Sequence, residues 1–326
     1  IGYGNKLLLA NTIKEPSNWR LLRYCVVLKS MLIATFIIIL GFIGLIWGAD
    51  KFVEGAAGLA QNLGVPPLIV GLTVVAFGTS APEIFSSAVA ALENKPELAI
   101  GNSFGSNLFN IGVVLGVCAL IKPLRVPATI LQKELPSLLI ITLATGLMLM
   151  DLNLGFLDAI LLLVIAALFT YLLVRYHLNL DTGSPKTTEQ LSEYEVSTIS
   201  FLRAVGYLTT GLLILVVSAE ALVQAASNIA KLLGVSTGII GLTIVALGTS
   251  LPELAASVAS VIKDRDELAV GNIVGSNIFN LLTVLPFPGF FAPGPFAKNL
   301  FYRDFSVVTL LTIVLCVFCY LSLKKR

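Results

Sequence analysis

The sequence predicts an all-α integral membrane protein made of two inverted-topology repeats of about five transmembrane helices each. Three observations predict this class. Hydrophobic residues make up 56% of the 326-residue chain and charged residues only 12%, whereas about a quarter of the residues in a soluble protein are charged. Long apolar segments recur along the whole chain, and an internal repeat relates its first half to its second.

The apolar segments set the number of expected membrane crossings. A helix of about 20 mostly apolar residues spans a bilayer. Nine segments meet this requirement, at residues 31–60, 66–92, 97–121, 131–150, 155–176, 200–231, 236–262, 267–289 and 303–323. Short charged or proline-containing turns separate most of them, and the longest polar stretch predicts a linker at residues 177–199.

The two ends of the chain bound the repeats. Residues 1–30 are polar and basic, and Met31 stands directly before the first apolar run, so we expect a leader of unclear role there. No cleavage site of a secretory signal follows a short apolar core. The first repeat then covers residues 31–176 and the second covers residues 200–326. A fifth span of the second repeat would fall beyond Arg326, so that unit is expected to lack its last helix.

The distribution of basic residues predicts the orientation. Lysine and arginine are enriched in cytoplasmic loops. Eleven of them lie on the same side as the linker, and four lie on the opposite side when residues 1–30 are left out. We therefore expect the linker and the C-terminus to be cytoplasmic, although the five basic residues of the leader argue the other way.

The internal repeat is the most specific of the three observations. A shift of 170 residues aligns residues 71–115 with residues 241–285 without a gap, and 23 of the 45 positions are identical. GLTVVAFGTSAPE matches GLTIVALGTSLPE, and GNSFGSNLFN matches GNIVGSNIFN. An odd number of spans per unit turns the second copy upside down. Inverted repeats are the architecture of secondary transporters, which bind their substrate at the repeat interface near the middle of the bilayer.

A polar motif interrupts the apolar run of the second predicted span. Gly78 and Pro82 weaken the helix there, because proline has no N–H for the carbonyl four residues back. Backbone released at this depth is tolerated only where protein or a water-filled cavity meets it. The oxygen-bearing side chains of the motif share one face, and the second copy repeats them: Thr79, Ser80 and Glu83, then Thr249, Ser250 and Glu253.

The paired glutamates point to a cation site. A carboxylate inside a span is costly and marks an ion pathway. No lysine or arginine lies in the inner parts of these spans, so a bound cation would relieve the repulsion between Glu83 and Glu253. Calcium takes about six to eight oxygen ligands, which the glutamates, threonines, serines, freed carbonyls and water would supply. Two negative charges would neutralise one Ca²⁺, whereas several Na⁺ would occupy the same oxygens.

A companion motif lies on the third and eighth predicted spans. Polar side chains recur there at every fourth position and form a stripe in each copy: Asn102, Ser106 and Asn110, then Asn272, Ser276 and Asn280. Small-xxx-small glycine pairs beside them, 101/105 and 271/275, allow close helix packing. One such stripe alone would serve equally well to join helices. Its duplication beside a duplicated glutamate motif favours an ion site.

Other functional classes have less support. No G-x-x-x-x-G-K-[ST] signature is present, which argues against a nucleotide-driven pump and leaves ion gradients as the energy source. The net charge of +2 and the absence of a basic stripe argue against nucleic-acid binding. Cys316 and Cys319 form a C-x-x-C in an apolar run, where we expect small apolar fillers rather than a redox or zinc site. We expect neither enzymatic activity nor a cofactor.

At these motifs the chain resembles the calcium/cation antiporter superfamily, in particular prokaryotic sodium/calcium exchanger-like proteins. The GTS-x-PE and GN-x-x-GSN-x-F-N blocks look like the two alpha repeats of that family. The resemblance implies ten helices in inverted halves, alternating access, exchange of Na⁺ for Ca²⁺, and a place in a prokaryotic inner membrane. It implies ligands at Thr79, Ser80, Glu83, Ser106, Asn110, Thr249, Ser250, Glu253 and Ser276, with backbone carbonyls from Ala76 and Ala246.

One departure from the family pattern leaves the ion pair open. Asn280 stands where several members carry aspartate, and this amide lowers the negative charge of the site on which calcium affinity, potassium dependence and stoichiometry depend. An antiporter for H⁺ and Ca²⁺ or for another cation pair would keep the same fold. A cation channel or a purely structural membrane protein would use the same polar spans differently.

Overall fold

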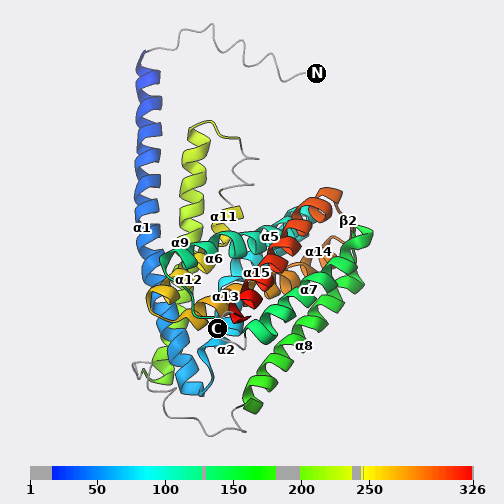
Figure 1. Ribbon diagram of the computed structural model, residues 1–326. Coiled ribbons are helices and arrows are strands. Elements are labelled where there is room, and N and C mark those ends of the chain that lie inside the picture. Colours follow the sequence, from blue (N-terminus) through cyan, green and yellow to red (C-terminus); the bar gives the residue numbers. More distant parts are fainter. Residues whose placement is uncertain (1–16, 127–129, 181–198, 237–243, 245, 325–326) are drawn as a thin grey trace.

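The computed structural model describes residues 17–126, 130–180, 199–236, 244 and 246–324, and these are almost entirely helical (Figure 1). The first repeat contains α1 (Ser17–Leu63), α2 (Pro67–Val70), η2 (Gly71–Val75), α3 (Ala76–Thr79), α4 (Ala81–Leu92), α5 (Pro96–Phe109), η3 (Asn110–Val114), α6 (Leu115–Ile121), η4 (Ile130–Glu134), α7 (Leu135–Met148), η5 (Leu149–Asp151), β1 (Asn153–Leu154) and α8 (Phe156–Leu180). The second contains α9 (Phe201–Leu232), α11 (Ala246–Thr249), α12 (Leu251–Ile262), α13 (Asp266–Phe279), η7 (Asn280–Val284), α14 (Pro286–Phe291), β2 (Gly294–Pro295), η8 (Leu300–Phe305) and α15 (Ser306–Lys324).

The membrane spans agree with the sequence prediction. Among the described residues, seven helices are long and apolar enough to cross a bilayer, and one bent helix pair passes the same test. The seven run over Cys25–Leu63, Pro96–Ile121, Ile130–Asp151, Phe156–Arg175, Phe201–Leu232, Asp266–Phe291 and Leu300–Leu321. The predicted span 236–262 lies partly outside the described residues, and its described end forms α12.

The first helix begins earlier than the apolar run indicates. α1 starts at Ser17, within the region predicted as a leader. No proline or glycine stands between Pro16 and Gly41, so nothing in that stretch interrupts the backbone hydrogen bonds of the helix. Polarity limits where a helix meets lipid, but it does not determine where the helix begins.

The predicted break in the second span is present. α3 ends at Thr79, Ser80 has φ −79° and ψ 3°, and α4 begins at Ala81, with a bend of 41° between the two parts. α11 and α12 are separated in the same way by Ser250. Pro82 and Pro252 each lie in the first turn of the following helix, where a missing N–H costs no hydrogen bond.

Wider π-helical turns occupy corresponding places in the two repeats. Asn110 opens η3 and Asn280 opens η7, so the last asparagine of each predicted polar stripe begins a π segment. Short π segments inside α-helices are rare and are often found at functional sites. The apolar runs around both asparagines predict plain α-helix, so these turns were not expected from the sequence.

The arrangement of turns shows that the second repeat is inverted. The span Pro96–Ile121 carries the chain from the turn after α4 to the loop after α6 on the opposite side. Lys122 in that loop forms ion pairs with Asp264 at 2.6 Å and Asp266 at 2.8 Å, which lie at the turn after α12. The turns after α4 and α12 are equivalent in the repeat, yet they lie on opposite sides of the helical bundle.

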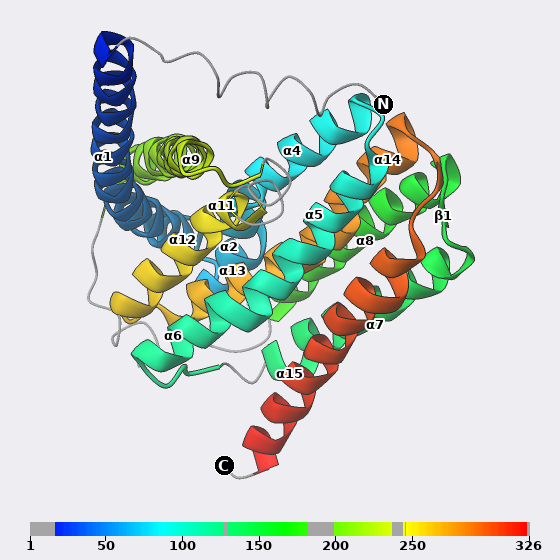
Figure 2. The same ribbon diagram turned by 90° about the horizontal axis from the view of Figure 1, so that it is seen from above.

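α1 and α9, the first helices of the two repeats, pack side by side at one edge of the bundle (Figures 1 and 2). Glycines allow their backbones to meet. A Cβ at Gly211 would lie 2.8 Å from the Cα of Phe52 and 2.9 Å from the carbonyl oxygen of Gly48. A second packed group joins α5, α7, α8 and α13, and most of the span Asp266–Phe291, which begins with α13, is buried.

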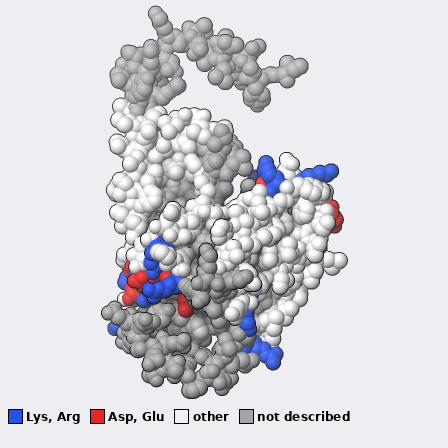
Figure 3. Space-filling model, viewed as in Figure 1, with Lys and Arg blue, Asp and Glu red and all other residues white. Residues whose placement is uncertain are grey.

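The outer surface suits a lipid environment. Large apolar side chains such as Phe36, Leu157 and Leu202 are exposed on α1, α8 and α9. Charged side chains gather in a few groups at the edges of the face shown in Figure 3, with broad uncharged areas between them. On such a surface, exposed leucines and phenylalanines contact acyl chains rather than water.

Candidate cation site

Both glutamates of the predicted site occupy the first turn of a helix. Glu83 is the third residue of α4 and Glu253 is the third residue of α12. The first turn of a helix has unpaired backbone N–H groups and the positive end of the macrodipole, which favour a carboxylate. Both side chains are fully buried. The helix break before each of them therefore places a carboxylate at a helix start inside the protein.

Serines from opposite repeats hold the two carboxylates. The hydroxyl of Ser80 donates to Oε1 of Glu253 at 3.1 Å, and the hydroxyl of Ser250 donates to Oε1 of Glu83 at 2.8 Å. Ser106 donates to the same oxygen of Glu83 at 3.3 Å, and its hydroxyl lies 3.2 Å from that of Ser250. The site is thus assembled across the repeat interface rather than within either copy.

Several buried polar atoms at the site have no hydrogen-bond partner among the described residues. They are Oε2 of Glu83, Oε2 of Glu253, and both side-chain amide atoms of Asn110 and of Asn280. Buried polar groups in folded proteins nearly always have a partner, so such a concentration requires an explanation. The four oxygens in this set are hard ligands of the kind that Ca²⁺ and Na⁺ take.

Thr79 and the carbonyl of Ala76 form the other described edge of the site. The Thr79 hydroxyl lies 3.0 Å from Oδ1 of Asn272 and 3.5 Å from Oγ of Ser276. Ser276 in turn donates to the carbonyl oxygen of Ala76 at 3.4 Å. The predicted carbonyl of Ala76 therefore faces the second repeat.

The two copies are not equivalent in this conformation. Ser106 binds a glutamate, whereas its counterpart Ser276 binds Thr79 and the Ala76 carbonyl. Thr79 is fully buried, whereas Thr249 is half-buried. Ala246 is the first residue of α11, and its side chain lies outside the described part of the chain. Asn110 and Asn280 are buried at the start of their π segments, and among the described contacts neither amide bonds a glutamate.

Each glutamate is supported by a pair of hydrogen bonds from an asparagine, and these bonds were not predicted from the sequence. The amide of Asn102 donates to the carbonyl of Glu83 at 3.2 Å and to the hydroxyl of Ser87 at 3.0 Å. The second copy repeats both bonds, from Asn272 to the carbonyl of Glu253 at 3.4 Å and to Ser257 at 3.0 Å. The signal was present, because the two serines are identical at the repeat offset and lie four residues after each glutamate.

Close helix packing around the site follows the glycine motif in one copy. A Cβ at Gly275 would lie 2.6 Å from the carbonyl oxygen of Leu72 and 2.7 Å from Cβ of Ala76. This contact brings α13 against η2 and α3, where the Ala76 carbonyl accepts the bond from Ser276. At Gly105, the same position of the first copy, a Cβ would meet no described atom within 4 Å.

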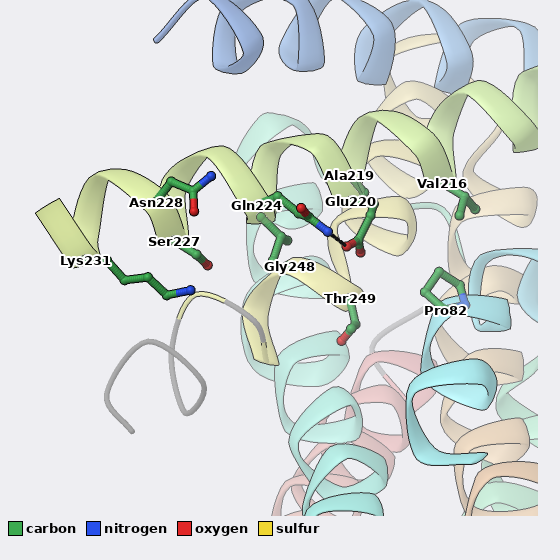
Figure 4. Close-up of a pocket in the computed structure, with 11 residues that line it drawn as sticks. Pro82, Val216, Ala219, Glu220, Gln224, Ser227, Asn228, Lys231, Gly248 and Thr249 are labelled. Atoms are coloured by element: carbon green, nitrogen blue, oxygen red, sulfur yellow. Dashed lines mark hydrogen bonds between the residues drawn. The ribbon is translucent and has the colours of Figure 1, made fainter. Parts of the chain in front are cut away.

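A cavity of about 350 Å³ reaches the edge of the site (Figure 4). Pro82 and Thr249, which both belong to the GTS-x-PE motifs, line its inner part. The opposite wall is a polar face of α9, formed by Glu220, Gln224, Ser227, Asn228 and Lys231. The cavity therefore lies beside the buried oxygens, on the side of α9. Among the described residues no three His, Cys, Asp or Glu side chains come together, so the site is built mainly from neutral oxygens around two carboxylates.

Comparisons with known proteins agree with this architecture. A family model described as sodium/calcium exchanger protein matches residues 33–175 and 203–325. CaxA of Alkalimonas amylolytica, named a putative antiporter, is 43% identical over 285 residues, which cover 87% of this chain and 89% of that protein. The inner membrane protein YrbG of Escherichia coli is 37% identical over 295 residues, 89% of this chain and 90% of that protein.

The fold also matches a solved exchanger. A structure of the sodium-calcium exchanger NCX_Mj, soaked with 2.5 mM Na⁺ and 0.1 mM Ca²⁺, is similar with a TM-score of 0.76 and 32% sequence identity, covering 88% of this chain and 90% of that chain. The repeat, the membrane spans and these matches lead to one conclusion. The chain belongs to the sodium/calcium exchanger family and is a multi-pass membrane transporter.

Proposed function

We propose that this protein exchanges Na⁺ for Ca²⁺ by alternating access, with both ions bound between Glu83 and Glu253. The observation that carries the proposal is the pair of buried carboxylates, each bonded to a serine of the other repeat and each with one oxygen unpartnered among the described residues. A buried, uncompensated carboxylate pair is unfavourable, and a cation between the two removes the penalty.

Charge and ligand number favour Ca²⁺ and Na⁺ as the competing ions. Two carboxylates balance one Ca²⁺, and the neighbouring hydroxyl, amide and carbonyl oxygens complete its coordination at about 2.3–2.6 Å after small rotations. Sodium ions use the same oxygens with less charge each, so the two ions exclude one another. Asn280 contributes an amide and no additional charge, which keeps the site at two negative charges.

The repeat supplies a route for alternating access. The cavity described above lies on one side of the site, along α9 and Thr249. Because the two repeats are inverted, an exchange of their conformations would open an equivalent path along α1 on the other side. Similarity to NCX_Mj, which is named a sodium-calcium exchanger, supports Na⁺ and Ca²⁺ as the two transported ions.

Transport into proteoliposomes tests the proposal. We would follow ⁴⁵Ca²⁺ uptake into vesicles loaded with Na⁺, with K⁺ or at acidic pH. Uptake is expected only with internal Na⁺, and Glu83→Gln or Glu253→Gln should abolish it. Glu97→Gln is the matched control, because Glu97 also lies in the first turn of a helix but is exposed and takes no part in the contacts of the site.

Other results would overturn parts of the proposal. Uptake driven by the acidic interior would replace Na⁺ by H⁺ and retain the paired-glutamate site. Flux without any counter-ion, and faster than carrier turnover, would indicate a channel. Full activity in both glutamine variants would refute the site itself.

A further inference from the structure

Equivalent helices of the two repeats pack differently. α1 packs against α12. In the other repeat, α9 corresponds to α1 and α4 corresponds to α12, but within the described residues α9 and α4 make no comparable contact. The cavity described above lies on the unpacked side and is lined by α9 and by Pro82 at the start of α4. Within the described part of the chain, the α12 side is therefore packed over the site, whereas the α9 side contains the cavity.

Ionic contacts from a single turn reinforce the closed side. Lys263, directly after α12, forms an ion pair with Asp50 of α1 at 2.6 Å and donates to the backbone carbonyl of Asp50 at 3.1 Å. Arg265 donates to the carbonyl of Val53 at 2.9 Å. The group of charges over α1 and α12 is visible at the left of Figure 3. These bonds attach the α12–α13 turn to the side of α1.

The same turn is also attached to the loop after α6. Lys122 bonds Asp264 and Asp266, and the backbone N–H of Arg125 donates to Asp266 at 3.0 Å. The hydrogen bond from Lys122 holds the pKa of Asp264 below its usual range. α1 is therefore tied through residues 263–266 to that loop, and the turn is not free to follow α1 if α1 moves.

The equivalent turn on the open side lacks the cation that pairs with α1, although Lys95 stands at the position of Arg265. Glu93 stands at the position of Lys263, and Glu220 stands at the position of Asp50. The backbone geometry is the same, because Asn94 and Asp264 both have φ of 58°. Lys95 pairs with Glu93 at 2.6 Å, and within the described part of the chain no hydrogen bond or ion pair joins this turn to α9. If α9 closed onto α4 as α1 closes onto α12, Glu93 and Glu220 would repel each other.

We propose that the contact of Lys263 and Arg265 with α1 is an ionic latch that keeps the α12 side closed while the α9 side is open. Glu93 and Glu220 cannot form an equivalent latch, because they would repel each other. This difference between the two sides favours the conformation in which the α12 side is closed. The inference rests on the proposed alternating-access function, and it assigns to this chain a charge asymmetry that sets which side is open at rest.

Cysteine accessibility tests the latch without any transport measurement. The background has Cys25, Cys118, Cys316 and Cys319 replaced by alanine. Ala57→Cys reports the closed side, because this buried position lies on the same face of α1 as Asp50 and Val53. Asn228→Cys reports the open side from the wall of the cavity. A charged thiol reagent is applied to each side of oriented vesicles in turn.

Removing the latch should open the closed side. Lys263→Gln and Asp50→Asn are each expected to raise the labelling rate of Ala57→Cys by about two- to fivefold, the range expected for partly exposed ion pairs, and to lower that of Asn228→Cys. The double variant should add little to either single change. Lys263→Arg keeps the charge and should label like the parent. Lys95→Gln is the matched control on the opposite turn; it leaves Glu93 without its cation and should not raise the labelling rate of Ala57→Cys.

Creating a latch on the other side gives the reciprocal test. Glu93→Lys places a cation opposite Glu220 and should slow the labelling of Asn228→Cys by about two- to fivefold, whereas Glu93→Gln should have a smaller effect. Unchanged labelling in Lys263→Gln, or an equal change in Lys95→Gln, would overturn the latch. A labelling shift without Na⁺-driven uptake would support the latch and refute the proposed exchange of Na⁺ for Ca²⁺. The failure of one proposal is therefore distinguishable from the failure of the other.

Discussion

Replacing Glu253 by glutamine removes one of two buried carboxylates and keeps the size of the side chain. This carboxylate accepts a bond from Ser80, while its second oxygen has no partner among the described residues. The same group is proposed to bind the transported ion. Glu253→Gln should therefore stabilise the ion-free protein and remove its stabilisation by Ca²⁺.

The two effects have comparable size. A buried charge carries a penalty of several kcal/mol, of which a charge-assisted hydrogen bond offsets about 1.5–3 kcal/mol, so the variant should gain about 1–3 kcal/mol without ions. At roughly 2 °C per kcal/mol for a chain of this length, Tm rises by about 2–6 °C. Calcium at about 100 times its Kd stabilises the wild-type protein by about 2.7 kcal/mol, or roughly 5 °C, and the variant should lose this shift.

Thermal unfolding in detergent, with a chelator or with Ca²⁺, measures both quantities. Glu97→Gln serves as the control and should retain the wild-type Tm and its calcium shift. A calcium-dependent rise of Tm in Glu253→Gln equal to that of the wild-type protein would refute the assignment of Glu253 as a ligand. A lower ion-free Tm would refute the argument that this carboxylate is unfavourable when no ion is bound.

Three further predictions concern the packing, the charge and the pH dependence of the same architecture. Gly211→Ala should destabilise the protein, because the added Cβ would meet the backbone of Phe52 and Gly48. Gly206→Ala on the same helix has no described atom within 4 Å of the added Cβ, so it should be neutral or stabilising by up to about 1 kcal/mol. The Tm values of the two variants check this. Asn280→Asp adds a third acid to a buried site and should lower the ion-free Tm while increasing the Tm shift on adding Ca²⁺, and an unchanged shift would place Asn280 outside the ion site. The pKa of Asp264 is held below its ordinary value of 3.8 by its bond to Lys122. The stability that this pair contributes is therefore present above pH 3.8 and is lost as pH falls through the lower, folded-state pKa. A Tm difference between wild type and Asp264→Asn that persists unchanged below that range would contradict the assignment.

Much of the fold could be read from the sequence because its signals are local or repeated. Continuous apolar runs determine where helices meet lipid, and the described spans agree with the predicted ones to within a few residues outside the partly undescribed segment 236–262. The break at Ser80 followed from Gly78 and Pro82, which weaken a helix in any context. The start of α1 at Ser17 was missed, since polarity does not mark the end of a helix that extends beyond the lipid.

The candidate site was predictable as a set of residues and not as a network. The repeat identified both glutamates and their neighbouring hydroxyls, because equal residues at equal spacing are visible without a structure. Which hydroxyl meets which carboxylate depends on how two segments some 170 residues apart pack together. Only the structure shows that Ser80 bonds Glu253 and Ser250 bonds Glu83. The supporting bonds of Asn102 and Asn272 depend on the same packing.

The sequence by itself determined that this protein crosses the membrane, contains an inverted duplication and places an acid at a broken helix in each half. Only the tertiary structure decided how the two repeated motifs differ in their surroundings. Two nearly identical motifs occupy different environments, with Thr79 buried against the second repeat and Thr249 beside a cavity. The physical reason is that the two halves pack against one another in one conformation at a time. α1 closes on α12 while α9 stands open from α4, and no alignment of the repeats with each other can show which side is closed.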